Sequence, residues 1–175
     1  MIVLQEVTLD VAGASEASIL AHLLEFYVHD LSALFAIDIG VDGRFGYERL
    51  PLYWSEPDTH FAFFVRVGGQ LAGFALATRG SPATHDPEDL DVAEFFILRS
   101  YRRARVGRQA AFLLWNVLPG RWVVRVAAAN HAGLAFWEST IRDYTGGAFD
   151  KTQQPGKHHT FHVFTFTTVP PVAVA

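Results

Sequence analysis

The sequence predicts an α/β fold in which about four helices flank one mixed, mostly antiparallel sheet of about seven strands. The expected elements follow the order β-α-(α)-β-β-β-α-β-α-β-β. Gly68 and Gly69 separate the apolar runs Phe61–Val67 and Leu71–Thr78, which is typical of a hairpin. A strand, a helix and another strand follow in the second half, and such a crossover is right-handed and adds one parallel pair. This mixed order argues against a doubly wound dinucleotide fold.

The N-terminal part of the chain is expected to hold a strand, a long helix and a loop. The strand covers Ile2–Thr8, and Ser15 is of the residue type that caps a helix. One side of that helix carries the apolar residues Ile19, Leu20, Leu23, Leu24, Tyr27, Val28 and Leu31. Ala36–His60 has glycines, prolines and aromatics more typical of a binding loop than of packing, with a short helix near Tyr47–Trp54.

The parallel crossover lies in the second half of the chain. Leu90–Leu98 is expected to be a buried strand, and an arginine-rich turn leads from it into an amphipathic helix. The face of this helix is formed by Val106, Ala110, Leu113, Leu114 and Val117. Pro119 and Gly120 end the helix, and Arg121–Ala128 is the returning strand.

The C-terminal part is expected to add one helix and two strands. Asn130 caps the helix, which continues to about Arg142. Thr145–Asp150 and His158–Thr168 are expected to form the final antiparallel pair. We expect residues 1–169 to form a single domain, and residues 170–175 to be a loose tail.

Composition narrows the classes of function. The chain has 175 residues, half of them hydrophobic, and no apolar run approaches the roughly 20 residues that span a bilayer, so we expect no membrane partner. The net charge of −4 argues against a nucleic-acid partner. The chain has no cysteine, which excludes disulfides, thiolate metal sites and a cysteine nucleophile. No secretory signal is seen, and we expect a cytoplasmic protein.

Histidines near the C-terminus raise the question of a metal site. His158 and His162 share the parity of one strand, but four residues span about 13 Å along a strand. Two ligands of one ion rarely lie so far apart, so the sequence predicts surface residues here and no metal.

The densest positive charge in the chain lies around the turn before the crossover helix. Five arginines fall between positions 99 and 108: Arg99, Arg102, Arg103, Arg105 and Arg108. A helix N-terminus offers unpaired N–H groups and a partial positive charge, so this turn suits a phosphate or pyrophosphate. The turn matches neither GxGxxG nor GxxxxGK[ST].

Two motifs around this turn carry a resemblance to a known family. Arg102–Gly107 follows Gln/Arg-x-x-Gly-x-Gly/Ala, except that Arg105 replaces the middle glycine. Asn130–Trp137 is similar to Asn-x-x-Ala-x-x-Leu-Tyr, with Gly133, Phe136 and Trp137 in place of the alanine, the leucine and the tyrosine. With these motifs and its strand order, the chain resembles the GCN5-related N-acetyltransferases, the GNAT superfamily. The resemblance covers nearly the whole chain and implies a twisted sheet and acetyl-CoA as co-substrate.

The resemblance also implies where coenzyme A binds. The expected contacts are Phe96, Ile97, Leu98, Arg102, Arg103, Arg105, Val106, Gly107, Arg108, Asn130, Phe136 and Trp137. Backbone N–H groups of the turn would bind the pyrophosphate, Gly107 would let the backbone approach it, and Arg105 would keep ordinary helical or bridge angles. The backbone of Phe96 and Leu98 would bind the pantetheine arm as an added strand, with Ile97 a further candidate.

Acetylation of an amine needs a base for the amine proton, an acid for the thiolate and a donor to the oxyanion. Glu94 is the expected base because burial in an apolar strand would raise its pKa, although it could also be a solvated carboxylate at the strand start. Tyr144 is the candidate acid in place of Trp137, with a packing role as the alternative. The Leu98 N–H is the expected oxyanion donor.

In GNAT proteins the first helix and the loop after it form the acceptor pocket. This places the candidate acceptor residues at Tyr27, His29, Asp30, Tyr47, Tyr53 and Trp54. The nearby carboxylates Asp38, Asp42 and Glu48, together with the aromatics, would suit a cationic amine through charge and cation–π contacts. The alternative is a solvated loop with scattered acids.

Three hypotheses of function follow. The first is an N-acetyltransferase in which a small-molecule or peptide amine attacks acetyl-CoA directly within a ternary complex. The second, kept open by Trp137, is a non-catalytic acyl-CoA-binding module of the same fold. The third is a structural domain whose C-terminal strands swap or add across a homodimer.

Overall fold

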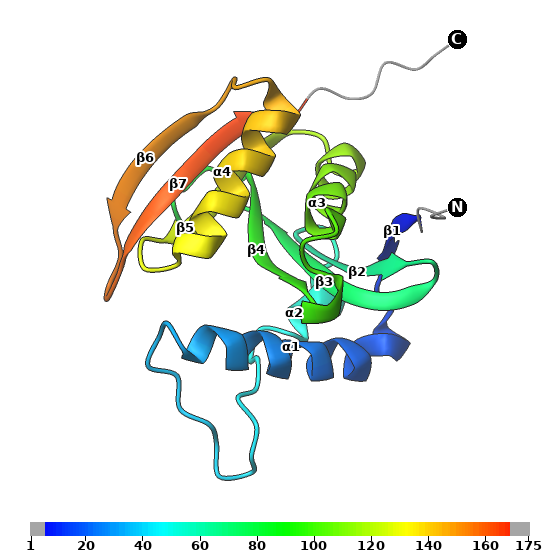
Figure 1. The fold of residues 1–175 in the computed structure, drawn as a ribbon. Coiled ribbons are helices and arrows are strands. Elements are labelled where there is room, and N and C mark those ends of the chain that lie inside the picture. Colours follow the sequence, from blue (N-terminus) through cyan, green and yellow to red (C-terminus); the bar gives the residue numbers. More distant parts are fainter. Residues whose placement is uncertain (1–5, 169–175) are drawn as a thin grey trace.

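The computed structural model describes residues 6–168, which form one seven-stranded sheet with helices on both faces (Figure 1). The strands are β1 (Val7–Val11), β2 (His60–Val67), β3 (Gln70–Arg79), β4 (Leu90–Ile97), β5 (Arg121–Ala127), β6 (Asp150–Pro155) and β7 (Thr160–Thr167). The α-helices are α1 (Ala17–Ser32), α2 (Leu52–Ser55), α3 (Val106–Val117) and α4 (His131–Thr145). The strand order is β1-β2-β3-β4-β5-β7-β6, and among these described strands only β4 and β5 are parallel. The predicted mixed α/β fold is therefore confirmed.

The parallel pair is short and then opens. β4 and β5 pair only at Leu90–Trp122 and Asp91–Val123, although β4 continues to Ile97. β5 instead pairs along its whole length with β7. Beyond Asp91, no strand within residues 6–168 neighbours the edge of β4 that faces β5, and the two strands separate in Figure 1.

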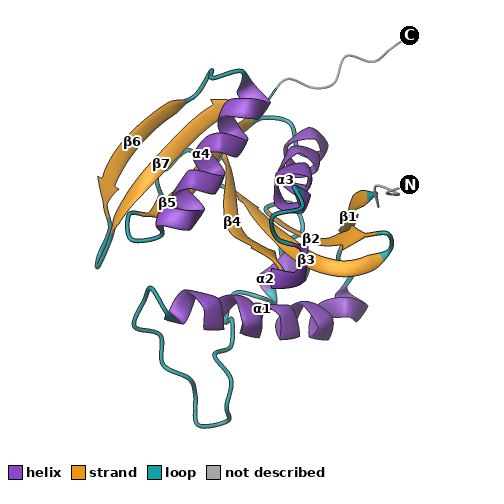
Figure 2. Cartoon of the chain, in the orientation of Figure 1, coloured by secondary structure: helices purple, strands orange, loops and turns teal. Residues whose placement is uncertain are grey.

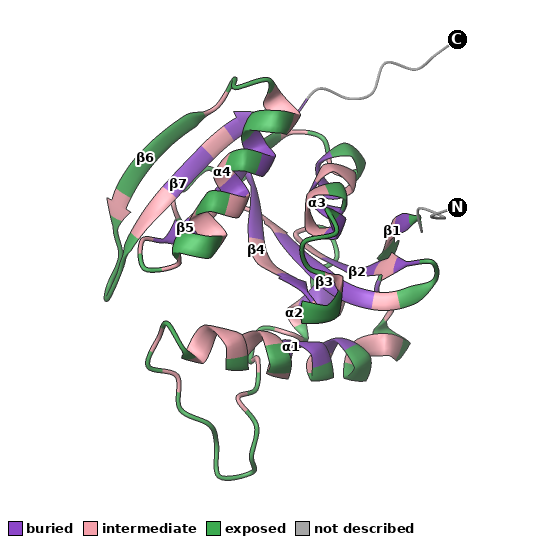
Figure 3. Cartoon of the chain, viewed as in Figure 1, coloured by how far each residue is buried: buried purple, intermediate pink, exposed green. Residues whose placement is uncertain are grey.

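Two layers of helices cover the sheet because alternate side chains of each strand point to opposite faces. α3 and α4 bury Trp115, Trp137 and Ile141 against one face. α1 and α2 bury Leu20, Leu23, Leu24 and Tyr53 against the other face, on Phe64, Phe74 and Leu76. Figure 3 shows the buried residues concentrated in the central strands and β6 exposed at the edge. The two faces thus hold separate apolar clusters, and both β3 and β4 contribute side chains to each face.

A close backbone contact fixes β4 against β3. A Cβ placed on Gly73 would lie 2.0 Å from the carbonyl oxygen of Phe96. Further along the pair the register shifts between Leu76 and Ala77, which leaves Ala93 as the additional residue of β4. This bulge lies directly before Glu94, so it sets the direction in which that side chain points.

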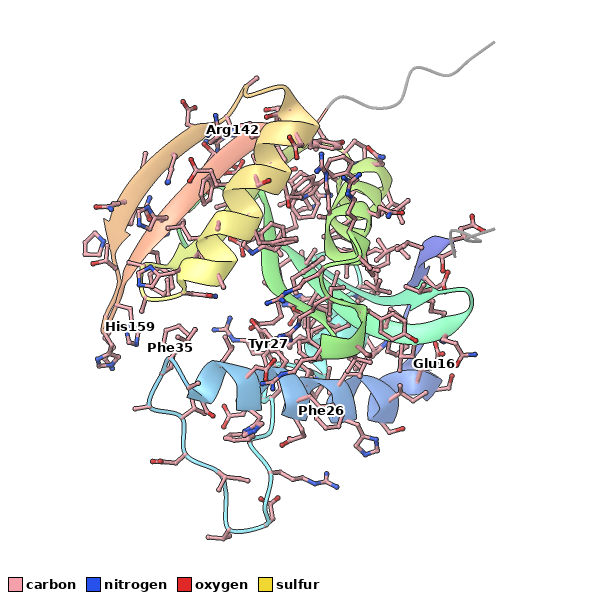
Figure 4. The ribbon with its side chains drawn as sticks, viewed as in Figure 1. Glu16, Phe26, Tyr27, Phe35, Arg142 and His159 are labelled. Atoms are coloured by element: carbon pink, nitrogen blue, oxygen red, sulfur yellow. The ribbon has the colours of Figure 1, made fainter. Side chains whose placement is uncertain are left out.

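The segment between α1 and α2 extends away from the sheet as a long loop (Figure 2). Near its start, the Phe35 ring contacts the His159 ring in the β6–β7 turn, with centroids 4.8 Å apart (Figure 4). None of the helices in residues 6–168 is long and apolar enough to cross a membrane.

Several expected boundaries need correction. The first strand is Val7–Val11, whereas the expected strand Ile2–Thr8 begins among residues 1–5, which lie outside the described part of the chain. The expected tail at residues 170–175 also lies outside the described part. Ser15 lies inside a 3₁₀ turn and caps nothing; the Gly13 N–H donates to Glu16 Oε2 instead. Thr145–Asp150 is not a strand, because α4 continues to Thr145 and ends at Gly146, whose φ is 64°.

The predicted helix cap at Asn130 and the predicted turn at Gly68 and Gly69 are both confirmed. The Asn130 side chain accepts a hydrogen bond from the Gly133 N–H at 2.9 Å, so it is the N-cap of α4. Gly68 and Gly69 have φ values of 55° and 80° in the β2–β3 turn. On α3, in contrast, Val117 is 55% exposed, and Trp115 is buried although it was absent from the predicted apolar face.

We predict that Gly73→Ala lowers the free energy of unfolding by about 3 kcal/mol or more, because the new methyl group must displace the backbone of β4. Gly13→Ala is the matched control, since its Cβ would meet only side-chain atoms, at 3.7 Å and 3.8 Å. Urea unfolding of both variants measures the difference. Equal stabilities would contradict the close β3–β4 contact.

Candidate functional site

The turn before α3 has an unusual backbone. Arg103 and Arg105 adopt left-handed conformations, with φ values of 66° and 60°. The expectation that Arg105 keeps ordinary helical angles is therefore wrong, and the position retains the geometry that a glycine would adopt. An L-residue in this region is disfavoured by about 1 kcal/mol or more. Such strain is typical of sites where the backbone must face a ligand.

The same turn presents a row of unpaired backbone donors. Within residues 6–168, no atom accepts a hydrogen bond from the N–H groups of residues 103–108. The first backbone bond of the helix joins the Gln109 N–H to the Arg105 carbonyl, so Val106, Gly107 and Arg108 are the free donors of its first turn. Together with the helix dipole, these groups form a site for an anion.

The arginine side chains of the turn divide into two groups. Arg99 and Arg102 both donate to Asp30 of α1, at 2.6 Å and 2.7 Å, and Arg102 Nε also donates to the Ile97 carbonyl at 2.7 Å. Arg103 and Arg105 are exposed and form no ion pair with the described residues. The guanidinium groups of this second group are therefore wholly free for a ligand at the turn.

Asp30, one of the expected acceptor-binding residues, connects α1 to the turn. Partial burial acts to raise its pKa, but the hydrogen bonds and charges of Arg102 and Arg99 outweigh this and hold the pKa below its ordinary value. Asp30 is therefore ionised near neutral pH. Arg108 is likewise engaged, in an ion pair with Asp143 of α4 at 2.5 Å.

Gly107 has a packing role that the sequence did not suggest. A Cβ at this position would meet the Phe136 ring at 3.2 Å and Ile97 at 3.5 Å. The missing side chain therefore makes room for α4. Phe136 stacks on Phe95 of β4, with centroids 6.1 Å apart, and Trp137 is buried against the same Phe95.

The backbone of β4 is oriented differently from the prediction. The Leu98 N–H donates to the Ala72 carbonyl at 2.8 Å, and the Phe96 carbonyl points at Gly73, so both residues use their backbone toward β3. Leu98 therefore cannot offer its N–H to an oxyanion, and Phe96 and Leu98 do not face the gap beside β5. Because alternate residues of a strand face opposite neighbours, Phe95 and Ile97 have their backbone groups on the open edge.

Glu94 lies on the α1 side of the sheet between two tyrosines. The Tyr27 hydroxyl donates to its Oε2 at 2.5 Å, and the Tyr47 hydroxyl donates to its Oε1 at 3.0 Å. Figure 4 shows Tyr27 between α1 and the sheet, where its ring contacts Phe74 and Phe96 edge-on. The carboxylate is thus held by the helix α1 and by the loop after it.

Burial shifts the acid–base properties of this group. It raises the pKa of Glu94 above the ordinary value, and the hydrogen bonds from Tyr27 and Tyr47 only partly oppose the shift. Burial and the neighbouring Glu94 also raise the pKa of Tyr27 and of Tyr47, so both remain protonated donors. The arrangement therefore provides a carboxylate of increased basicity, oriented by two neutral hydroxyls.

A cavity of about 240 Å³ opens beside Glu94. It is lined by Tyr47, Arg49, Tyr53, His60, Thr78, Arg79, Gly80, Pro82, Ala93, Glu94 and Arg125. Among the predicted acceptor residues, Tyr47 and Tyr53 line it, whereas Trp54 donates to the Ala12 carbonyl at 3.0 Å and belongs to the core. His29 and Asp30 line a separate depression with Phe96 and Leu98.

The cavity holds arginines that sequence reasoning missed. Arg49, Arg79 and Arg125 come from the loop before α2, the end of β3 and the middle of β5. Arg125 interrupts an otherwise buried strand, which is the one local signal that could have marked it. The expected carboxylates Asp38, Asp42 and Glu48 are exposed and line neither depression.

Tyr144 does not belong to this site. Its hydroxyl donates to Asn116 Oδ1 at 2.7 Å, and its ring packs on Phe112 and Trp115 of α3. Asn116 lies about 15 Å along α3 from the N-terminus of that helix. Tyr144 is therefore a packing residue at the far end of the α3–α4 contact, and its predicted role as general acid has no support. No group of three or more potential metal ligands occurs in residues 6–168.

No protein-family model matches the sequence, and no curated protein matches it. Solved structures match over nearly the whole chain. The structure is similar to an acetyltransferase from Thermus thermophilus, with a TM-score of 0.67 and 18% identity over 94% of this chain and 99% of that one. It is also similar to a Desulfovibrio desulfuricans protein assigned to the GNAT family (TM-score 0.63, 10% identity, 93% and 99% coverage).

A third similar structure is an aminoglycoside acetyltransferase in complex with coenzyme A (TM-score 0.66, 12% identity, 93% and 95% coverage). These likenesses show that the chain has the GNAT fold, so the fold expected from the sequence resemblance is confirmed.

We predict that Arg105→Gly raises the free energy of unfolding by about 1 kcal/mol, because glycine adopts the left-handed conformation without the steric penalty. The matched control is Gln109→Gly, an exposed residue inside α3, which should lose about 1 kcal/mol. Chemical denaturation measures both. A destabilised Arg105→Gly variant would contradict the strained turn.

Proposed function

We propose that this GNAT-fold chain is an acetyl-CoA-dependent N-acetyltransferase. One observation carries the proposal: the unpaired N–H groups of residues 103–108 lie at the end of β4, and the base candidate Glu94 lies on the same strand. The likeness to acetyltransferases, one of them in complex with coenzyme A, supports it.

The residues present fit coenzyme A. The N–H groups of residues 103–108 would bind the pyrophosphate, with the exposed side chains of Arg103 and Arg105 as further donors. The backbone groups of Phe95 and the N–H of Ile97 would bind the pantetheine arm as an added strand, beside the Ile97 carbonyl that accepts from Arg102 Nε. Asn130 lies where β5 leads into α4, and Phe136 stands between the turn and β4.

Acetyl-CoA supplies an activated acetyl thioester, and the chain supplies the base. Glu94 would accept the proton of the acceptor amine at one of its carboxylate oxygens, directly or through water. Tyr27 and Tyr47 occupy one lone pair on each oxygen, which fixes the carboxylate and leaves acceptor capacity for that proton. The raised pKa of Glu94 makes it a stronger base than a solvated carboxylate.

A second candidate is a non-catalytic coenzyme A-binding module. It is favoured by Trp137, which is buried against Phe95 and Trp115 at the position where the family motif has a tyrosine. Binding of coenzyme A without thiol release for any amine would identify this function.

The coenzyme A site is tested by the double variant Arg103→Glu, Arg105→Glu. We expect its affinity for coenzyme A to fall roughly tenfold or more, because two exposed donors become repulsive charges. Calorimetric titration measures the affinity. Arg44→Glu is the control, since it makes one such charge reversal at an exposed arginine in the loop before α2, away from the turn. Unchanged affinity in the double variant would remove the turn from the site.

The base is tested by Glu94→Gln. We expect a strong loss of kcat with little change in coenzyme A affinity. In the parent protein kcat/KM should rise with pH through the raised pKa of Glu94, and the variant should lose this acid limb. Full activity of the variant across the pH range would show that another group is the base.

The same shift affects folding. Because the folded-state pKa of Glu94 is above the unfolded value, its contribution to stability is complete below the unfolded pKa and is lost as pH rises through the folded one. Glu94→Gln should therefore be less sensitive to pH in this window, which thermal unfolding at several pH values can measure.

A further inference from the structure

We propose that the acceptor amine also carries an anionic group, a carboxylate or a phosphate, which binds Arg125 and Arg49 in the cavity beside Glu94. The inference rests on the proposed function and names the class of its acceptor. It adds an anionic group to the cationic amine expected from the sequence, because the carboxylates behind that expectation lie outside the cavity.

The buried carboxylate of Asp91 holds the Arg125 side chain in place. Its Nε donates to Asp91 Oδ2 at 2.9 Å and its Nη2 donates to Asp91 Oδ1 at 2.8 Å. Asp91 is fully buried and also accepts a hydrogen bond from Ser81 Oγ at 2.6 Å. This bidentate pair fixes the plane of the guanidinium, so little conformational entropy is lost when a ligand binds it.

The Arg125 guanidinium still has N–H donors that are free to bind a ligand. Arginine has five N–H donors, and Arg125 Nη1 makes no hydrogen bond with any residue in the range 6–168. Arg125 lines the cavity together with Glu94. A planar fork that is fixed on one side and open to a cavity on the other matches the geometry of a carboxylate or phosphate.

The charge balance of the cavity favours an anion. Three arginines line it, and Glu94 is the one carboxylate among the lining residues. Arg125 is paired with Asp91, and Arg79 reaches Glu88 at 3.8 Å, but Arg49 has no ion pair within the described chain.

One molecule can satisfy both signs of charge. Its amine would lie toward the Glu94 carboxylate and its anion toward Arg125 and Arg49. An amine without an anion would leave Arg49 without an ion-pair partner within residues 6–168 and the Nη1 donors of Arg125 without an acceptor. The volume of about 240 Å³ lies below the roughly 300–1,000 Å³ of sites for drug-sized ligands, so the acceptor group that enters is small.

Matched pairs of amines test the inference. L-alanine with ethylamine and L-phenylalanine with 2-phenylethylamine differ by a carboxylate, and O-phosphoethanolamine with ethanolamine differs by a phosphate. Thiol release from acetyl-CoA gives kcat/KM for each, and ligand-observed NMR gives binding without turnover. We expect at least one anionic compound to exceed its neutral partner by about tenfold or more.

Arg49→Gln is the diagnostic variant, because Arg49 is exposed and its replacement should not disturb folding, whereas Arg125 is paired with a buried carboxylate. We expect the KM of the favoured anionic compound to rise about tenfold, with unchanged calorimetric affinity for coenzyme A. The matched control, Arg44→Gln, changes an exposed arginine of the same loop that lines neither depression, and should leave the KM unchanged.

The outcomes separate the two proposals. Equal or better use of the neutral amines, or no effect of Arg49→Gln on the anionic preference, would overturn the inference while the acetyltransferase function stands. Absence of both coenzyme A binding and thiol release would overturn the proposed function, and with it the inference. The carboxylate and phosphate pairs identify which anion the cavity accepts.

Discussion

The divergence of β4 from β5 is the constraint on which the rest of the structure depends. The two strands pair at Leu90 and Asp91 and then separate, while α3 connects them across one face. The separation leaves the β4 edge open, and it brings the N-terminus of α3 to the end of that edge. The bidentate Asp91–Arg125 pair lies where the strands part, so one buried interaction holds the vertex and also directs a guanidinium into the cavity.

Helix α1 connects the two halves of the proposed site. Tyr27 binds Glu94, and Asp30, three residues later on the same helix, binds Arg99 and Arg102. The two carboxyl groups respond in opposite ways. Burial raises the pKa of Glu94, whereas for Asp30 the two arginines outweigh burial and lower the pKa. A shift of α1 would therefore disturb the base candidate and the turn together.

Sequence patterns alone determined the fold, the hairpin at Gly68–Gly69, the Asn130 cap and the location of the arginine-rich turn. These features depend on local periodicity and on residue types with a fixed conformational preference, which short stretches of sequence express. The same kind of pattern singled out Glu94 as the candidate base, since a carboxylate inside an apolar strand is unusual.

Only the tertiary structure decided which groups meet. The backbone direction of Phe96 and Leu98 depends on the register with β3, and a shift of one residue reverses which edge each faces. The acidic residues counted along the loop after α1 were a poor guide to the charge of the cavity, because its arginines come from three separate elements. The partners of Asp30, Tyr144 and Arg125 likewise lie far away in the sequence. Such contacts follow from how the elements pack against one another, and local sequence carries no record of that packing.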